Sequence, residues 1–191
     1  MPMRVDVSEP GFVARHDPAL HACVRARGAG VVTGCSADEL YGCFRDFGGW
    51  QSWLPAVEFN LRGDSVGTQV GATRTVVFSP EKCLRERLTA LDDDARSITY
   101  VGLNYGCYAS NEDKYPLSAS PFPGSFIDYK STATVRVITV PASPHSAFLE
   151  WEGEVWTEAE HAGAMRDFLT NFYEGNIGTL NAHFAAARSE R

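Results

Sequence analysis

The spacing of hydrophobic residues changes twice along the chain, and this succession limits the fold more than any other feature. From Leu40 to Phe47, apolar side chains recur at intervals of three and four, the pattern of one helix face. From residue 57 to residue 156 they recur mostly at every second position, which is typical of strands with one buried face. Helical spacing then returns from Met165 to Phe184. A run of strands between short helices and one long helix predicts an α+β fold, with the long helix packed on an antiparallel sheet.

Local signals place the expected helix ends. Ser36 and Glu39 have the spacing of a capping box, and a Gly-Gly pair after Phe47 ends the first helix. Residues 50–55, closed by a proline, predict a second short helical turn. Thr157 and Glu160 form a second apparent capping box, so the long helix is expected to begin there.

The expected strands are separated by short segments rich in glycine, proline and aspartate, as in an antiparallel meander. They cover residues 24–33, 57–61, 69–78, 83–91, 96–103, 129–140 and 147–156. The first 22 residues contain three prolines and no periodicity, which predicts an N-terminal arm (1–22) before a single domain (23–188).

Four segments resemble a known superfamily. They are residues 47–55 (FGGWQSWLP), 66–74 (VGTQVGATR), 85–93 (RERLTALDD) and 129–135 (YKSTATV). They are similar to the START-like helix-grip (SRPBCC) proteins, which include polyketide cyclases/dehydratases, birch-pollen-allergen-like proteins and plant abscisic-acid receptors. The resemblance extends from about Val24 to Phe184. It implies that a curved seven-stranded antiparallel sheet wraps around the C-terminal helix, with two short helices after strand 1. An apolar cavity between sheet and helix would hold a lipid, hormone or polyketide.

One departure from the superfamily narrows the function. The abscisic-acid receptors carry a lysine that holds the hormone carboxylate after the short helices, and the nearest position here is Leu54. This difference argues against hormone reception.

Two charges interrupt the apolar faces of adjacent strands. Arg74 shares a face with apolar residues of segment 69–78, and Glu86 shares one with apolar residues of segment 83–91. Because side chains alternate between the two faces of a strand, both charges should point inward and lie opposite or diagonal to each other. The two expected apolar faces consist of Val70, Ala72, Val76 and Phe78, and of Leu84, Leu88 and Ala90.

The pair has two interpretations. It is either a structural ion pair that fixes strand register, or a polar anchor inside an apolar cavity. In the second case Arg74 would bind a carboxylate, phenolate or enolate oxygen, and Glu86 would move protons.

Other candidate residues follow from the same alternation. Tyr129 and Ser131 share the expected inward face of Ala133, Val135 and Val137, whereas Glu150, Glu152 and Glu154 lie on the solvated face opposite Trp151. Asn176 is the polar residue of the long helix stripe and matches a pocket-facing asparagine of the superfamily. The expected ligand-binding residues are Trp53, Arg74, Phe78, Glu86, Tyr100, Tyr129, Ser131, Trp151, Phe172 and Asn176.

The segment 105–126 is unusually long for a connection between strands. It contains three prolines and five aromatic residues. Since long loops are usually functional or disordered, and disordered segments are poor in aromatic residues, we expect an ordered lid over the cavity. The alternative is a contact between two copies of the chain in a homodimer.

Charge and motif content argue against several classes of function. The chain has 17 Lys and Arg against 24 Asp and Glu, a net charge of −7, and no basic stretch, which argues against nucleic-acid binding. No apolar run is long enough to span a membrane, and no signal peptide is evident. The cysteines and histidines lack metal-site spacing, and the glycines between Gly28 and Gly34 lack the βαβ context of a dinucleotide site. We therefore expect a cytoplasmic protein without metal or cofactor.

Two functions remain open from the sequence. The first is binding of a hydrophobic small molecule, a lipid, polyketide or aromatic metabolite, with one polar end. The second is a cofactor-free enzyme that resembles a polyketide cyclase or dehydratase. In such an enzyme Glu86 would act as acid or base, Arg74 would stabilise an enolate-like charge, and Tyr129 would donate a hydrogen bond.

Overall fold

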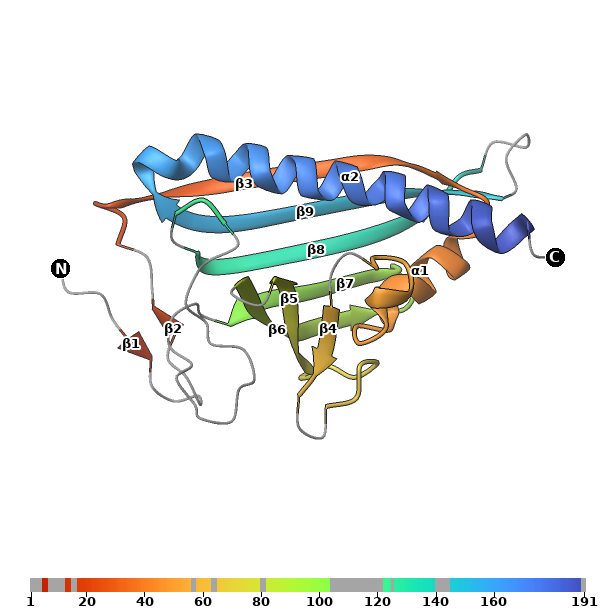
Figure 1. Cartoon of the computed structure of the whole chain (residues 1–191), viewed down its shortest axis with the longest axis horizontal. Coiled ribbons are helices and arrows are strands. Elements are labelled where there is room, and N and C mark those ends of the chain that lie inside the picture. Colours follow the sequence, from red (N-terminus) through yellow and green to blue (C-terminus); the bar gives the residue numbers. More distant parts are fainter. Residues whose placement is uncertain are drawn as a thin grey trace.

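A seven-stranded antiparallel sheet and one long helix form the body of the protein (Figure 1). The computed structural model describes residues 5–6, 13–14, 17–55, 58–62, 65–79, 82–103, 122–124, 126–139 and 145–189. In chain order the elements are β1 (Val5–Asp6), β2 (Val13–Ala14), β3 (His21–Thr33), α1 (Ala37–Arg45), the 3-10 turn η1 (Trp50–Ser52), β4 (Glu58–Leu61), β5 (Thr73–Ser79), β6 (Lys82–Asp92), β7 (Ser97–Leu103), β8 (Ile127–Val137), β9 (Ser146–Glu158), the 3-10 turn η2 (Ala159–His161) and α2 (Ala162–Ser189).

The order of strands in the main sheet is β3-β9-β8-β7-β6-β5-β4, and all neighbours are antiparallel. The 28-residue helix α2 runs along β3 and β9 on one face of this sheet (Figure 1). The predicted α+β helix-grip fold is therefore confirmed. The two predicted short helices are α1 and η1, which follow the first strand of the main sheet.

The predicted capping box at the start of α1 is confirmed. The Glu39 amide donates a hydrogen bond to Ser36 Oγ at 3.2 Å, and the Ser36 amide donates to Glu39 Oε2 at 2.7 Å. Two indoles then fix the turn that follows, because Trp50 donates to the Phe44 carbonyl and Trp53 donates to the Cys43 carbonyl. These bonds place both indoles in the core, against α1.

The predicted second capping box is wrong. Strand β9 continues to Glu158, and the Thr157 hydroxyl donates to Glu158 Oε2 at 3.2 Å instead of capping a helix. The turn η2 separates the strand from α2, which begins at Ala162, and the N-cap residue of η2, Glu158, makes no side-chain capping hydrogen bond. Thr157 lies within β9, completely buried and five residues before the start of α2, so it does not cap that helix.

Three residues of the expected inward faces are exposed. Val70 is 58% exposed because it lies in a turn before β5 begins at Thr73. Ala90 is exposed because the pairing of β6 with β7 shifts by a bulge between Leu88 and Ala90, which changes the face of the following residue. Val137 is 56% exposed at the end of β8.

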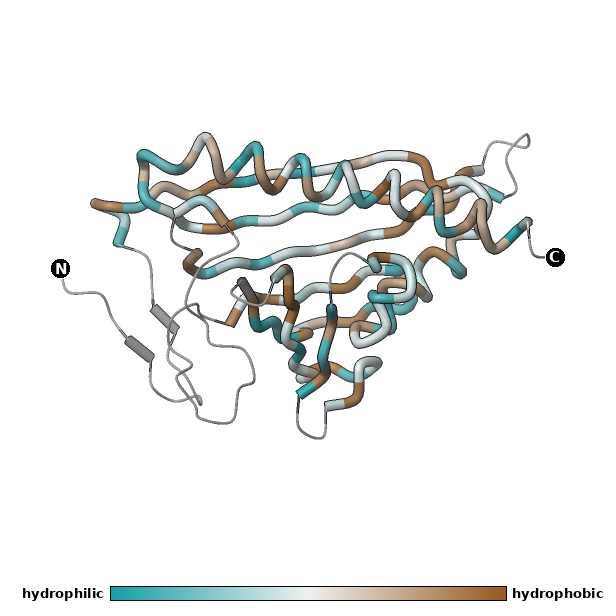
Figure 2. The backbone as a smooth tube through the Cα atoms, viewed as in Figure 1, coloured by the Kyte–Doolittle hydropathy of each residue, from teal (hydrophilic) through white to brown (hydrophobic). Residues whose placement is uncertain are grey.

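Two glycines let α2 pack close to the sheet. A Cβ on Gly28 of β3 would lie 2.6 Å from Tyr173 Cβ and 2.8 Å from the Glu174 nitrogen. A Cβ on Gly153 of β9 would collide with the Tyr173 hydroxyl. Hydrophilic and hydrophobic residues alternate along the turns of α2, as expected for a helix with one buried side (Figure 2).

The first strand of the main sheet begins at His21, three residues before the predicted start. Ahead of it, within the predicted arm, β1 and β2 pair as a separate two-stranded sheet. The division into an arm and a single domain stays a prediction.

Candidate functional site

An ion pair is buried on the inner face of the sheet. Arg74 of β5 and Glu86 of β6 are direct cross-strand partners, which confirms the predicted pairing. Arg74 Nε donates to Glu86 Oε2 at 2.8 Å, and Nη2 lies 2.6 Å from the same oxygen. The two side chains are only 1% and 7% exposed. The third nitrogen, Nη1, donates to the Phe47 carbonyl at 2.6 Å.

Aromatic rings surround the Arg74 guanidinium. Its central carbon lies 3.7 Å from the centre of the Phe47 ring and 3.8 Å from that of Trp50. Phe59 and Tyr100 lie farther out, at 4.6 Å and 5.6 Å. Cation–π attraction of this kind stabilises a charge that has lost its water.

Burial changes the ionisation of both partners. Loss of water raises the pKa of the Glu86 carboxyl, and the nearby Arg74 charge only partly opposes this shift. The same loss lowers the pKa of the Arg74 guanidinium. A carboxyl whose pKa is raised in this way is suited to giving and taking a proton.

A hydrogen-bonded group of polar side chains lies farther along the inner face. The Trp151 indole donates to Ser131 Oγ at 2.9 Å and to the Tyr100 hydroxyl at 3.2 Å. Ser131 Oγ in turn donates to the Glu152 carbonyl at 2.9 Å. All three of these side chains are completely or almost completely buried.

Tyr173 of α2 joins this group and was not among the predicted residues. Its hydroxyl lies 2.9 Å from the Tyr129 hydroxyl and 3.5 Å from Ser131 Oγ. Burial raises the pKa of Tyr173 to about 12. The signal that could have identified it is the pair of glycines on β3 and β9, because a large side chain of α2 needs the room they leave.

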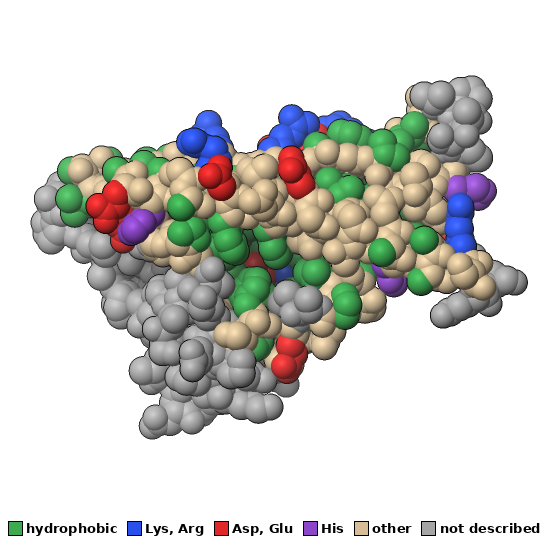
Figure 3. All heavy atoms as spheres, turned by 45° about the horizontal axis from the view of Figure 1, so that its top comes forward, with side chains coloured by type: hydrophobic (Ala, Val, Ile, Leu, Met, Phe, Trp, Pro, Cys, Tyr) green, Lys and Arg blue, Asp and Glu red, His purple; other side chains and the backbone are tan. Residues whose placement is uncertain are grey.

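A narrow cavity lies between this face of the sheet and α2. Four polar side chains line it: Arg74, Glu86, Tyr100 and Tyr129. The remaining lining is apolar and consists of Trp50, Phe59, Val76, Phe78, Leu84, Phe122, Phe168, Leu169 and Phe172. The free space is only about 20 Å³, which is room for about one water molecule. Hydrophobic side chains gather around a hollow below α2 on the surface of the molecule (Figure 3).

The structure brings six of the ten predicted ligand-binding residues to the cavity: Arg74, Phe78, Glu86, Tyr100, Tyr129 and Phe172. Trp53, Ser131, Trp151 and Asn176 are buried but do not line it. The Asn176 Nδ2 has no hydrogen-bond partner within the described part of the chain. Contact with a ligand stays a prediction for all ten.

Most of the expected lid, 105–126, falls outside the described residues, which include only 122–124 and 126 of it. Phe122 stacks on Phe126 with ring centres 4.2 Å apart and meets Phe168 of α2 edge-on at 5.1 Å. Phe126 fits where Gly102 of β7 has no side chain. The Phe122 ring therefore fills one side of the cavity.

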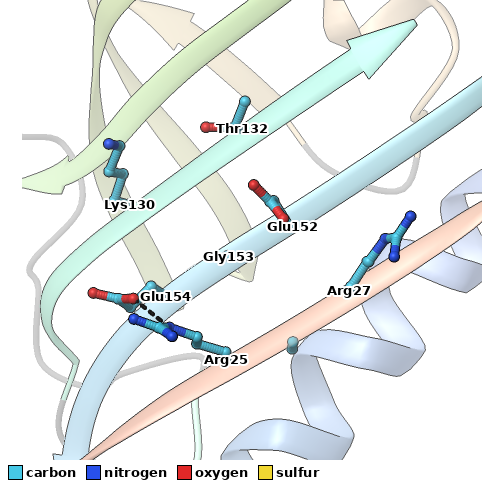
Figure 4. Close-up of a pocket in the computed structure, with 8 residues that line it drawn as sticks. Arg25, Arg27, Lys130, Thr132, Glu152, Gly153 and Glu154 are labelled. Carbon is cyan, nitrogen blue, oxygen red and sulfur yellow. Dashed lines mark hydrogen bonds and ion pairs between the residues drawn. The ribbon is translucent and has the colours of Figure 1, made fainter. Parts of the chain in front are cut away.

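A second, open hollow of about 580 Å³ lies on the opposite face of the sheet (Figure 4). Its walls are charged side chains of β3, β8 and β9, which confirms that the glutamates of β9 face away from Trp151. These charges largely neutralise one another, as Arg25 donates to Glu154 at 2.6 Å and Arg27 lies 2.7 Å from Glu150. Exposed pairs of this kind contribute little to stability.

The described residues contain neither a candidate metal site nor a candidate membrane span. Among them, no group of three or more His, Cys, Asp and Glu side chains is arranged to hold a metal ion. None of the helices within the described ranges is long and apolar enough to cross a membrane.

Comparison with known proteins identifies a family that matches most of the chain. Residues 29–185 match the profile of a family described as polyketide cyclase/dehydrase and lipid transport. No curated protein matches the chain.

Solved structures share the fold at low sequence identity. An uncharacterised protein from Bacillus thuringiensis is 19% identical with a TM-score of 0.64, over 85% of this chain and 99% of that one. The protein XoxI from Bacillus cereus is 19% identical with a TM-score of 0.65, over 86% and 98%. Norcoclaurine synthase from Thalictrum flavum, solved with dopamine and hydroxybenzaldehyde, is 15% identical with a TM-score of 0.61, over 91% and 90%. At these identities the likeness concerns the fold alone.

Proposed function

The chain belongs to the polyketide cyclase/dehydrase and lipid transport family, and from this membership we propose that it binds a hydrophobic small molecule with one polar end between its sheet and α2. The observation that carries the proposal is the lining of the cavity. Nine apolar side chains surround it, and the polar groups are confined to Arg74, Glu86 and two tyrosines. Sites for small molecules commonly combine a mostly apolar wall with a few placed polar groups.

Entry of such a ligand requires side chains to move, since the free space is about 20 Å³. Phe122 is the ring best placed to do so. It belongs to no helix or strand and is only partly buried, whereas the other lining rings are held by α2, η1 or strands. A ligand ring that takes the place of Phe122 would keep the aromatic contacts with Phe126 and Phe168.

A second candidate function is catalysis of the polyketide cyclase or dehydratase type. It is favoured by Glu86, a buried carboxyl with a raised pKa on the cavity wall. In this reaction, as predicted from the sequence, Glu86 would act as acid or base, Arg74 would stabilise an enolate-like charge, and Tyr129 would donate a hydrogen bond. Norcoclaurine synthase, solved in complex with dopamine and hydroxybenzaldehyde, illustrates that the same fold can hold aromatic molecules.

The test is recovery of the bound molecule. Purified protein is extracted with organic solvent and the extract analysed by mass spectrometry, with Val76→Phe as a variant that fills the cavity. The matched control is Val137→Phe, because Val137 is exposed and does not line the cavity. We expect a hydrophobic molecule from the wild type and from the control, and much less from Val76→Phe. Equal recovery from all three proteins, or from none, would reject the proposal.

The molecule recovered in this way also distinguishes the two candidate functions, binding and catalysis. A binding protein returns it unchanged after incubation, whereas an enzyme converts it. Glu86→Gln should abolish conversion while binding persists if Glu86 transfers the proton.

Three sequence predictions accompany this proposal. The cytoplasmic location rests on the five cysteines, whose spacing does not predict disulfides, and the absence of a nucleic-acid partner rests on the net charge of −7. A homodimer contact through segment 105–126 stays an alternative to the lid.

A further inference from the structure

We propose that the polar end accepted by this cavity is a hydrogen-bond donor, a hydroxyl or amino group, and not a carboxylate or another anion. The inference rests on the proposed binding function and specifies its ligand class. It follows from which hydrogen-bonding positions on the cavity wall are already in use.

The charge of Arg74 is already paired, which disfavours an anionic ligand. Each of its three guanidinium nitrogens contacts a protein oxygen, two of them Glu86 Oε2 and the third the Phe47 carbonyl, so only one N–H on each of Nη1 and Nη2 is left. The Phe47 and Trp50 rings lie 3.7 Å and 3.8 Å from its central carbon. Its charge is also neutralised by Glu86, so a second anion would enter a low-dielectric site without a counter-charge.

Glu86 offers an acceptor instead. Both contacts from Arg74 go to Oε2, and no described residue donates a hydrogen bond to Oε1. Since Glu86 lines the cavity, Oε1 is the oxygen left for a ligand. An ionised carboxylate only accepts hydrogen bonds, so its partner must carry a proton.

Tyr129, like Glu86, is inferred to present a hydrogen-bond acceptor to the cavity. Either hydroxyl can donate in the Tyr129–Tyr173 contact at 2.9 Å and in the Tyr173–Ser131 contact at 3.5 Å. Because Ser131 gives its single proton to the Glu152 carbonyl, both contacts are satisfied only if Tyr173 donates to Ser131 and Tyr129 donates to Tyr173. In this arrangement, which we infer, the Tyr129 oxygen has no proton left for a ligand, contrary to the donor role predicted for it from the sequence.

Tyr100 completes the arrangement. Its oxygen accepts a hydrogen bond from the Trp151 indole at 3.2 Å, and its own proton stays available. A ligand hydroxyl can donate to Glu86 Oε1 and accept from Tyr100 at the same time. A carboxylate would instead face the Glu86 oxygen with two acceptors of its own.

Titration calorimetry at pH 7.5 with the intact chain and four matched ligands tests this preference for a hydrogen-bond donor. 4-Propylphenol and 4-propylaniline carry donors, 4-propylbenzoate carries an anion, and propylbenzene carries neither. We expect both donor ligands to bind at least ten times more tightly than 4-propylbenzoate. Benzoate binding equal to or tighter than phenol binding would overturn the inference but leave the binding function intact. Failure of all four ligands to bind would overturn both.

A single hydroxyl deletion provides a sharper test. In Tyr173→Phe the Tyr129 proton loses its acceptor and becomes available to the cavity, so the preference for phenol over benzoate should fall several-fold. The control is Tyr41→Phe, because Tyr41 donates to Asp93 at 2.9 Å and does not line the cavity. An unchanged preference in both variants would show that the tyrosine protons are not arranged as inferred and would overturn the proposal.

Discussion

The Arg74 guanidinium is held by one carboxylate, one carbonyl and the faces of aromatic rings, so its removal should affect stability strongly. Arg74→Met leaves the Glu86 charge buried without a partner, which typically costs about 3–5 kcal/mol. Urea unfolding should show this loss. The double variant Arg74→Met with Glu86→Leu should recover much of it, because no unpaired charge is left. A double variant no more stable than Arg74→Met would contradict this account of the pair.

The raised pKa of Tyr173 predicts how the stability of the protein changes at alkaline pH. Burial raises its pKa from 10.0 to about 12, so between these values the unfolded chain loses the proton while the folded protein keeps it. The folded state then binds more protons, and this contribution to stability decreases as pH rises, by about 1.4 kcal/mol per pH unit. Tyr173→Phe removes one ionising group. Its stability between pH 10 and pH 12, measured by urea unfolding, should fall less steeply than that of the wild type, whereas parallel curves would contradict the assignment.

Arg74 and Tyr173 show what the spacing of residues along the chain can and cannot predict. Arg74 and Glu86 were predicted to pair because each occupies an inward position on an adjacent strand joined by a short turn. Tyr173 was missed because its partners, Tyr129 and Ser131, come from a strand more than forty positions away. Helical spacing predicts that a side chain is buried, but not which hydroxyl meets it.

At the scale of elements, we expect the two capping boxes predicted from the sequence to differ in their contribution to stability. Ser36→Ala removes an acceptor from the first turn of α1 and should cost about 1 kcal/mol of stability. Glu160→Ala should have almost no effect, because η2 has no side-chain cap and Glu160 is exposed. Thermal unfolding of the two variants measures the difference. A comparable loss in both would mean that a second box acts at the start of α2.

The close approach of α2 to the sheet makes a second prediction at this scale. Gly153→Ala should destabilise the fold by forcing the Tyr173 hydroxyl away, and Tyr173→Phe should partly rescue it because that hydroxyl is the colliding atom. Gly28→Ala should be rescued much less, since its new methyl would meet Tyr173 Cβ and the helix backbone. Urea unfolding of the single and double variants gives both coupling energies. Equal rescue at the two glycines would contradict this packing.

Strand boundaries were less predictable than strand identity. A bulge after Leu88 turns Ala90 outward, and a turn before Thr73 exposes Val70. In both cases the residue types fit a regular strand, and the irregularity depends on pairing with a neighbouring strand. The sequence therefore predicted the order of elements and the inner face, but not these local shifts.

At the scale of the whole molecule, the helix and sheet close around a cavity that is almost filled by the protein's own rings. The sequence predicted a cavity from the superfamily resemblance and from inward polar residues. It did not predict the filling, because Phe122 reaches the cavity from a segment without periodicity. We therefore expect the position of this one ring to decide how much space a ligand finds.

Phe122→Ala should therefore open the site. We expect propylbenzene to bind more tightly and to associate faster, because the ligand no longer displaces a ring that stacks on Phe126 at 4.2 Å. The control is Phe184→Ala, a half-buried ring of α2 that does not line the cavity, which should lose stability without gaining affinity. Calorimetry and stopped-flow fluorescence measure the affinity and the association rate. Weaker binding in Phe122→Ala than in the wild type would mean that Phe122 forms part of the wall that holds the ligand, because a ring that only occupied the ligand's place would strengthen binding when removed.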